Sequence, residues 1–91
     1  MKVGVIGSGG REHAICTSLK KSKNIDKIYC FPGNAGTSFI AENIEIELNN
    51  FEELKRVIEE LGIDIIIVGP EKPIVDGIVD FLTQNKIKVF G

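Results

Sequence analysis

Three glycines, Gly7, Gly9 and Gly10, lie within four positions between an apolar run and a segment compatible with a helix. In this order of elements, the backbone N–H groups at the start of the helix point at the turn. Glycines let the chain bend sharply there and let an anion approach the backbone closely. Arg11 adds a cation and Glu12 a carboxylate directly after the turn. The stretch therefore predicts a phosphate-binding or nucleotide-binding turn at the front of an α/β domain.

Two further loops carry groups that could recognise a ligand. Gly69, Pro70 and Glu71 follow the most apolar run of the chain, and Asn34 lies in the turn-forming segment 32–37. A phosphate is bound by N–H groups or arginine, whereas sugar hydroxyls need fixed acceptors such as carboxylates. Because both kinds of group are present, the three loops favour a sugar phosphate. In the alternative interpretation, Glu12 caps its own helix and Glu71 is a solvated loop residue.

A dinucleotide site is the simplest other interpretation of Gly7-x-Gly9, and two features count against it. Glu12 occupies the position of the third glycine of the dinucleotide fingerprint, and the segment Phe31-Pro32-Gly33 ends the second strand without an acidic residue for a ribose. The turn also lacks the Gly-Lys-Ser/Thr ending of a P-loop, which excludes a P-loop NTPase.

The apolar periodicity predicts the elements that position these loops. Parallel strands buried on both faces have nearly continuous apolar runs, and helices bury one apolar stripe. The predicted fold is a single, small, doubly wound and mostly parallel five-stranded sheet of the Rossmann-like α/β class, with helices on both faces. In such a sheet the loops after the first, second and fourth strands lie at the carboxyl ends, where ligands bind. The predicted strands are 2–6, 27–31, 44–48 (at an edge), 64–68 (near the centre) and 87–90. The predicted helices are 11–21 (with Ala14, Ile15, Ser18 and Leu19 near one face), a helix that Asn49 or Asn50 caps and Gly62 ends, and 73–84. The apolar stripe of the second helix consists of Phe51, Leu54, Val57, Ile58 and Leu61.

Composition places the chain among ordinary globular proteins. With 91 residues it has room for one domain, and its net charge of −2 argues against a nucleic-acid partner. The N-terminal apolar run is too short for a signal peptide or a membrane span, so we expect a cytoplasmic protein without a membrane partner. Cys16 and Cys30 are too few for a disulfide framework and are interpreted as reduced, buried, small hydrophobic residues. A nucleophilic pairing of Cys16 with His13 is disfavoured.

At these loops the sequence resembles the phosphoribosylamine–glycine ligase family of the ATP-grasp superfamily. The resemblance is carried by three motifs in matching order and spacing, and it covers essentially the whole chain. Two small departures are Ser8, where the family often has Asn, and Lys72, where it usually has a small or apolar residue. The motifs are Gly7-Ser8-Gly9-Gly10-Arg11-Glu12-His13-Ala14, Pro32-Gly33-Asn34-Ala35-Gly36-Thr37 and Val68-Gly69-Pro70-Glu71-Lys72-Pro73.

The resemblance implies a ligase that joins glycine to 5-phosphoribosylamine, with ATP and magnesium or manganese, in purine biosynthesis. Residues 1–91 would be the N-terminal substrate-binding domain, with ATP and the metal bound outside it. The backbone near Gly9 and Gly10, helped by Arg11, would bind the phosphate. Glu12 and Glu71 would contact a ribose hydroxyl or the amine, and Asn34, Gly69 and Pro70 would line the same mouth.

By this resemblance the chain is a fragment, inactive alone, that packs on its own ATP-grasp and C-terminal domains. No residue within 1–91 is expected to be catalytic or to bind a cofactor or a metal. Two alternatives remain: a free-standing Rossmann-type module that binds or senses a nucleotide, and a purely structural domain whose loops are ordinary turns.

Overall fold

The structure is a computed structural model that describes residues 1–7, 10–47, 50–68 and 72–90, without the side chains of residues 11 and 72–76. Strands and helices alternate along these residues, as the periodicity predicts. The strands are β1 (Lys2–Gly7), β2 (Lys27–Pro32), β3 (Glu42–Asn43), β4 (Ile65–Val68) and β5 (Val89–Phe90), and the helices are α1 (Gly10–Lys20), the 3₁₀ helix η1 (Thr37–Phe39), α2 (Phe51–Leu61) and α3 (Lys72–Gln84).

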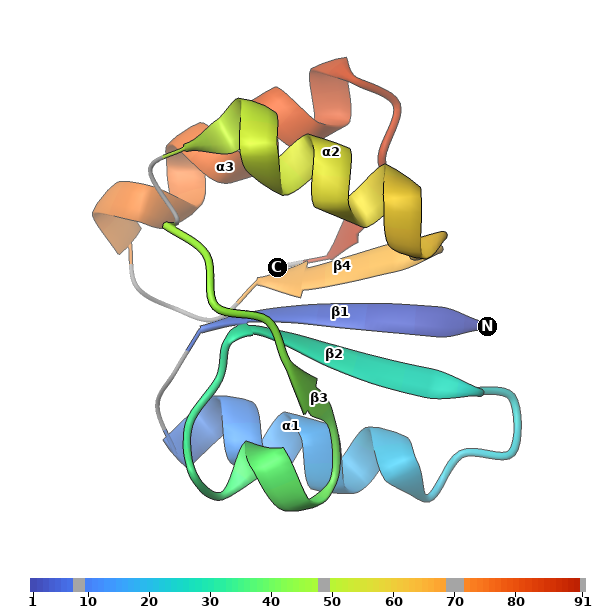
Figure 1. The fold of residues 1–91 in the computed structure, drawn as a ribbon. Helices are drawn as coiled ribbons and strands as arrows, with labels where there is room; N and C mark the ends of the chain where they lie inside the picture. Colours follow the sequence, from blue (N-terminus) through green and yellow to red (C-terminus); the bar gives the residue numbers. More distant parts are fainter. Residues whose placement is uncertain (8–9, 48–49, 69–71, 91) are drawn as a thin grey trace.

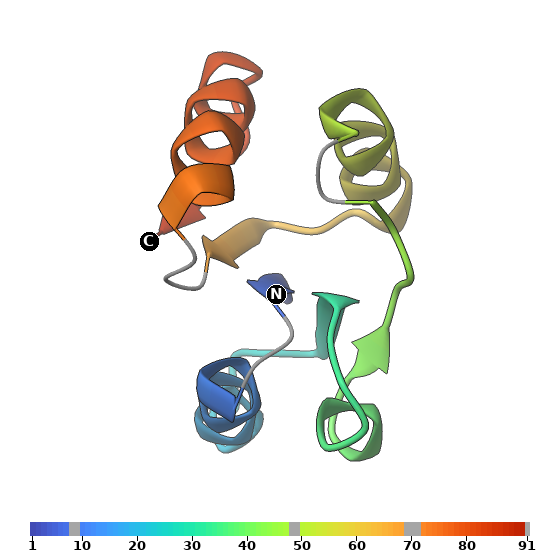
Figure 2. The same cartoon turned by 90° about the vertical axis from the view of Figure 1, so that its left-hand side faces the viewer.

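The five strands form one sheet in the order β3-β2-β1-β4-β5, and all four pairings are parallel. Helices α2 and α3 cover one face of the sheet, and α1 and η1 cover the other (Figures 1 and 2). The predicted fold class, a doubly wound parallel sheet with helices on both faces, is therefore confirmed. The order of the strands changes direction at β1, which places its carboxyl end at the switch point of the sheet.

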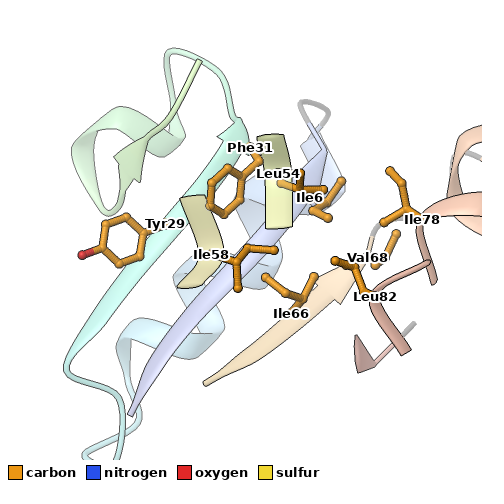
Figure 3. Packing of buried hydrophobic residues seen from close by; sticks show 9 residues of the cluster. All are labelled: Ile6, Tyr29, Phe31, Leu54, Ile58, Ile66, Val68, Ile78 and Leu82. Atoms are coloured by element: carbon orange, nitrogen blue, oxygen red, sulfur yellow. The ribbon is translucent and has the colours of Figure 1, made fainter. Parts of the chain in front are cut away.

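Side chains that alternate along the strands divide the core in two. Figure 3 shows the cluster between the sheet and the helices α2 and α3, where Phe31 and Ile66 lie fully buried near Leu54 and Ile58 of α2. The other cluster lies under α1 and combines both cysteines with three β-branched strand residues. Its buried members are Val3, Val5, Cys16, Ile28 and Cys30.

Helix α2 follows its sequence signals closely. The Asn50 side chain accepts a hydrogen bond from the Glu53 N–H at 3.2 Å, which makes it the N-cap. Gly62 ends the helix with φ at 70°, the left-handed conformation that glycine adopts without strain. Leu54 and Ile58 are buried, and the other members of the predicted stripe (Phe51, Val57 and Leu61) are partly buried against the same cluster.

The prediction of a strand at 44–48 is wrong in its bounds. Of the described residues in this segment, Glu42 and Asn43 alone pair with β2, and the Ile44 N–H adds one more bond to the Cys30 carbonyl at 2.7 Å. Ile44 and Ile46 are nevertheless partly buried against the core under α2. The alternating apolar residues therefore mark a segment that packs on the core on its way to α2 and does not pair as a strand. The predicted position at a sheet edge holds for β3.

The predicted buried face of the first helix is also partly wrong. Ala14 and Ser18 are exposed, and Glu12 and Cys16 are the buried residues, with Ile15 and Leu19 partly buried around them. The hydrophobic pattern missed this face because its first member is a carboxylate, which a periodicity argument assigns to solvent.

Candidate functional site

The carboxyl ends of β1, β2 and β4 lie at one edge of the sheet. The Gly33 N–H donates to the Gly7 carbonyl at 3.0 Å, which ties the loop after β2 to the end of β1. Ile6 pairs with Val68, so β4 ends beside β1. Helices α1 and α3 both begin at this edge, which faces the viewer in Figure 2. The parallel register thus brings the ends of three strands, the loop after β2 and two helix N-termini to one edge.

Glu12 is the most unusual side chain at this edge, because it is a carboxylate with only 2% of its surface exposed. It lies in the first turn of α1, where a negative charge interacts favourably with the helix dipole. A Cβ built on Gly7 would lie 2.0 Å from the Glu12 Oε1, and the Gly7 φ is 142°. Gly7 is therefore required both by its backbone conformation and by the space that the Glu12 carboxylate occupies.

The loop after β2 is held by a hydrogen-bonded network around Thr37, a fully buried side chain. The Thr37 Oγ1 accepts from the Asn34 N–H at 2.8 Å and lies 2.8 Å from the Asn43 Oδ1. The Asn43 Nδ2 donates to the Asn34 carbonyl at 2.8 Å. Gly33 has φ at 77°, and a Cβ there would lie 2.2 Å from the Asn43 Oδ1. These contacts fix the shape of the loop that lines the edge.

Asn34 and His13 contribute to this loop as structural residues. The Asn34 Oδ1 accepts from the Thr37 N–H at 3.0 Å, so this side-chain oxygen stabilises the turn. The exposed His13 ring of α1 lies against Gly36, where a Cβ would be 3.1 Å from the His13 Cδ2. The glycine motif and the loop after β2 are therefore in direct contact across the edge.

The structure describes part of the predicted site. Gly10 and the backbone of Arg11 begin α1, beside Glu12, and Asn34 lies in the neighbouring loop. Gly9, Gly69, Pro70 and Glu71 lie outside the described residues, as does the Arg11 side chain. The described members, Gly10, Glu12 and Asn34, thus belong to one edge of the sheet.

Sequence reasoning missed a pair of thiols behind this edge. The Cys16 Sγ of α1 and the Cys30 Sγ of β2 are 3.2 Å apart, and both residues have no exposed surface. The expectation of free, buried cysteines is confirmed, but their proximity was not predicted. The Cys16 side chain, with a smaller effect from Thr37, holds the pKa of Cys30 below its usual value, and the hydrogen bond with Cys30 and burial raise the pKa of Cys16. The sequence alone could not reveal this pair, because the two residues are 14 positions apart and meet through the packing of α1 on β2.

Other features of the described residues lie away from this edge. A surface hollow of about 670 Å³ lies beside β2 and β3, and it is lined by residues such as Lys20, Lys27 and Phe39 and by no predicted site residue. Within the described ranges, no group of three His, Cys, Asp or Glu residues could hold a metal ion. No helix in the described part of the chain is long and apolar enough to cross a membrane.

Comparison with known proteins agrees with this arrangement. The family described as "Phosphoribosylglycinamide synthetase, N domain" matches residues 1–91. The chain is 50% identical, over 91 residues, to a phosphoribosylamine–glycine ligase of Caldanaerobacter subterraneus subsp. tengcongensis, covering 100% of this chain and 22% of the relative. A ligase of the same name from Clostridium acetobutylicum is 43% identical over 91 residues, with the same coverage of 100% and 22%. The chain thus spans about a fifth of the length of these relatives.

Two solved structures resemble the fold. The crystal structure of phosphoribosylamine–glycine ligase from Thermotoga maritima has a TM-score of 0.68 and 31% identity, and the match covers 100% of this chain and 19% of that one. A saccharopine dehydrogenase from Saccharomyces cerevisiae has a TM-score of 0.76 at 16% identity, covering 97% and 20% of the two chains, which is a likeness of fold alone. The edge geometry, the three motifs and the match over every residue lead to one conclusion. The chain belongs to the family of phosphoribosylglycinamide synthetase N-terminal domains.

Proposed function

We propose that residues 1–91 are the N-terminal domain of a phosphoribosylamine–glycine ligase and bind the phosphoribosyl group of its substrate. The whole protein would join glycine to 5-phosphoribosylamine with ATP hydrolysis, in the cytoplasm. The family match over residues 1–91 carries the proposal, and it is supported by relatives of this name that are about five times longer. The domain alone would not be catalytic, since it packs on the ATP-grasp and C-terminal domains that complete the enzyme.

The carboxyl edge offers the groups that a sugar phosphate requires. The N-terminus of α1 begins at Gly10 and presents backbone N–H groups with the positive end of a helix dipole. We assign phosphate binding to the backbone of Gly9 and Gly10, with Arg11 adding charge. Glu12 is a carboxylate fixed at this edge by burial, and we assign it, together with Glu71, to a ribose hydroxyl or the amine.

The remaining loop residues would shape the mouth of the site. Asn34 is held by the Thr37 network, and we propose that this loop and the Gly69-Pro70 segment line the opening. ATP and magnesium or manganese would bind in the other domains, where the activated glycine forms. The net charge of −2 gives no support for a nucleic-acid partner.

The test is a steady-state assay of the full-length protein that contains this chain, following ADP formation with glycine and 5-phosphoribosylamine. Glu12→Gln removes the charge and keeps the size, and we expect the KM for phosphoribosylamine to rise about tenfold or more. The KM for ATP should stay within about twofold of that of the parent protein. Glu59→Gln is the matched control, because Glu59 is an exposed carboxylate on α2.

Two results would contradict different parts of the proposal. A parent protein that forms no ADP with these substrates would show that the activity is wrong. An active Glu12→Gln variant with an unchanged KM for phosphoribosylamine would show that the activity is right and the role of Glu12 is wrong.

A further inference from the structure

The buried thiols of Cys16 and Cys30 are in direct contact. The Cys16 and Cys30 Sγ atoms are 3.2 Å apart, compared with about 2.05 Å in a disulfide bond. Neither residue has exposed surface, and both belong to the buried cluster under α1. The two sulfurs are therefore held next to each other and shielded from other thiols.

Regular elements on both sides hold this contact in place. Cys30 lies within β2 and pairs with Val5 of β1, an internal strand of the sheet. Cys16 lies in the middle of α1, one turn after Glu12 and on the same buried face. Because neither cysteine is in a loop, the helix and the strand hold the two sulfur atoms in contact.

We propose that Cys16 and Cys30 form a redox modification site, in which a reversible disulfide links α1 to β2 directly behind the glycine turn. The ligand class is a small disulfide, of which oxidised glutathione is the probe. This inference is independent of the proposed function, because it depends only on the two sulfurs and the elements that carry them.

The exchange with oxidised glutathione passes through a mixed disulfide, with Cys30 taken as the attacking thiolate. After a local opening of α1, the Cys30 thiolate attacks one sulfur of oxidised glutathione, and one glutathione thiolate leaves. Cys16 then loses its proton and attacks the Cys30 sulfur of the mixed disulfide, releasing the second glutathione. Two protein thiols are oxidised, and one glutathione disulfide is reduced to two glutathione molecules.

The disulfide would act on the site through α1. Glu12 and Cys16 share one face of this helix, and Glu12 lies against Gly7 at the end of β1. A covalent link at Cys16 would restrict any movement of the first turn relative to the sheet. The expected consequence is a more rigid carboxyl edge in the oxidised protein.

The test compares the tendency of the two cysteines to pair in the folded and the unfolded protein. The full-length protein is equilibrated with reduced and oxidised glutathione, once in buffer and once in concentrated urea, and is then acid-quenched and alkylated. Trypsin releases Cys16 in peptide 12–20 and Cys30 in peptide 28–55, each with a single cysteine, so mass spectrometry identifies their linked form directly. We expect the ratio of linked to reduced peptides to be at least about tenfold higher in buffer than in urea, because the fold replaces a flexible loop by direct contact.

Cys16→Ala and Cys30→Ala are the controls, and each should abolish the linked peptide while leaving the other cysteine reduced or joined to glutathione. A linked fraction in buffer equal to or below that in urea would overturn the proposal. That result would mean that the fold keeps the two thiols apart as inert core residues, and it does not depend on the folding of any variant.

Discussion

At the scale of single residues, Gly7 and Glu12 show how the candidate site is built. The carboxylate lies against the glycine at the end of β1, where a side chain on Gly7 would overlap it. A buried carboxylate is costly unless polar groups compensate it, and the first turn of α1 supplies a favourable helix dipole. This environment fixes the Glu12 side chain against the end of β1.

The Gly7→Ala substitution tests this contact. The φ of 142° is strained for alanine, and its Cβ would lie 2.0 Å from the Glu12 Oε1. We expect the free energy of unfolding to fall by more than about 2 kcal/mol in urea denaturation of the chain. Gly10→Ala is the matched control, because a Cβ on Gly10 meets nothing within 4 Å. It should leave stability unchanged or raise it by up to about 1 kcal/mol, and equal losses in both variants would contradict the contact.

The sequence predicted which residues lie close together at this edge better than it predicted their surroundings. Gly10, Glu12 and Asn34 are indicated by residue type and spacing, and all three lie at one edge of the sheet. The burial of Glu12 and the contact of Cys16 with Cys30 could not be predicted, since both depend on how α1 rotates over the sheet. A polar residue on a buried helix face is invisible to hydrophobic periodicity.

At the scale of elements, the loop after β2 depends on one hydroxyl. The Thr37 Oγ1 lies within hydrogen-bond distance of the Asn34 N, the Asn34 carbonyl and the Asn43 side chain. This hydroxyl therefore helps to connect the loop to β3, together with the Asn43 Nδ2 bond to the Asn34 carbonyl. Its network ties Asn34 to the edge that we assign to the substrate.

Thr37→Val removes these bonds and keeps the shape of the side chain. We expect a loss of about 1–3 kcal/mol in the free energy of unfolding, because buried polar groups lose their partner. Ser38→Ala is the control: the exposed Ser38 Oγ donates to the Ala35 carbonyl at 2.6 Å, and its removal should cost no more than about 0.5 kcal/mol. Chemical denaturation followed by circular dichroism measures both values, and similar small losses would show that the network contributes little.

The N-cap of α2 can be tested by substitutions at Asn50. Asn50→Ala removes the side-chain acceptor of the Glu53 N–H and should destabilise the chain by about 0.5–2 kcal/mol. Asn50→Ser restores an N-cap acceptor and should recover most of this loss. If serine were no better than alanine, the cap would not account for the start of the helix.

Elements with strong local signals were predicted almost to the residue. The helix predicted between Asn49 or Asn50 and Gly62 corresponds to α2, with Asn50 as its N-cap, and the helix predicted at 73–84 corresponds to α3. The predicted strand at 44–48 was wrong because an alternating pattern reports burial of one face, whereas strand pairing also needs a neighbour. The two-residue β3 shows that this neighbour is available only where β2 lies alongside.

At the scale of the whole molecule, the parallel sheet organises both core and site. Its inner strands carry many of the buried hydrophobic residues, and the carboxyl ends of β1, β2 and β4 lie at one edge (Figures 1 and 3). The strand order could be predicted only as a class, because periodicity along a chain does not specify which strands become neighbours. The right-handed crossovers and the alternation of strands and helices were sufficient for the class itself.

Substitutions of Phe31 and Phe90 compare how much burial at the centre and at the edge of the sheet contributes to stability. Phe31 has 0% of its surface exposed, whereas Phe90 on the edge strand β5 has 70% exposed. We expect Phe31→Ala to lower the free energy of unfolding of the chain by about 3–5 kcal/mol and Phe90→Ala by less than about 1 kcal/mol. Comparable losses in urea denaturation would show that the edge strand is buried in the folded chain.

The most direct test of the central claim is an amide NMR titration of the isotope-labelled full-length protein with glycinamide ribonucleotide, and separately with NAD. The ribonucleotide replaces the labile amine substrate and carries the same phosphoribosyl group. The account predicts that the ribonucleotide shifts the amides of Gly10, Glu12 and Asn34, while NAD leaves them unchanged. Shifts at these amides with NAD alone would identify a dinucleotide module and contradict the assignment. Unchanged amides at saturating ribonucleotide would contradict the claim that this edge binds the phosphoribosyl group.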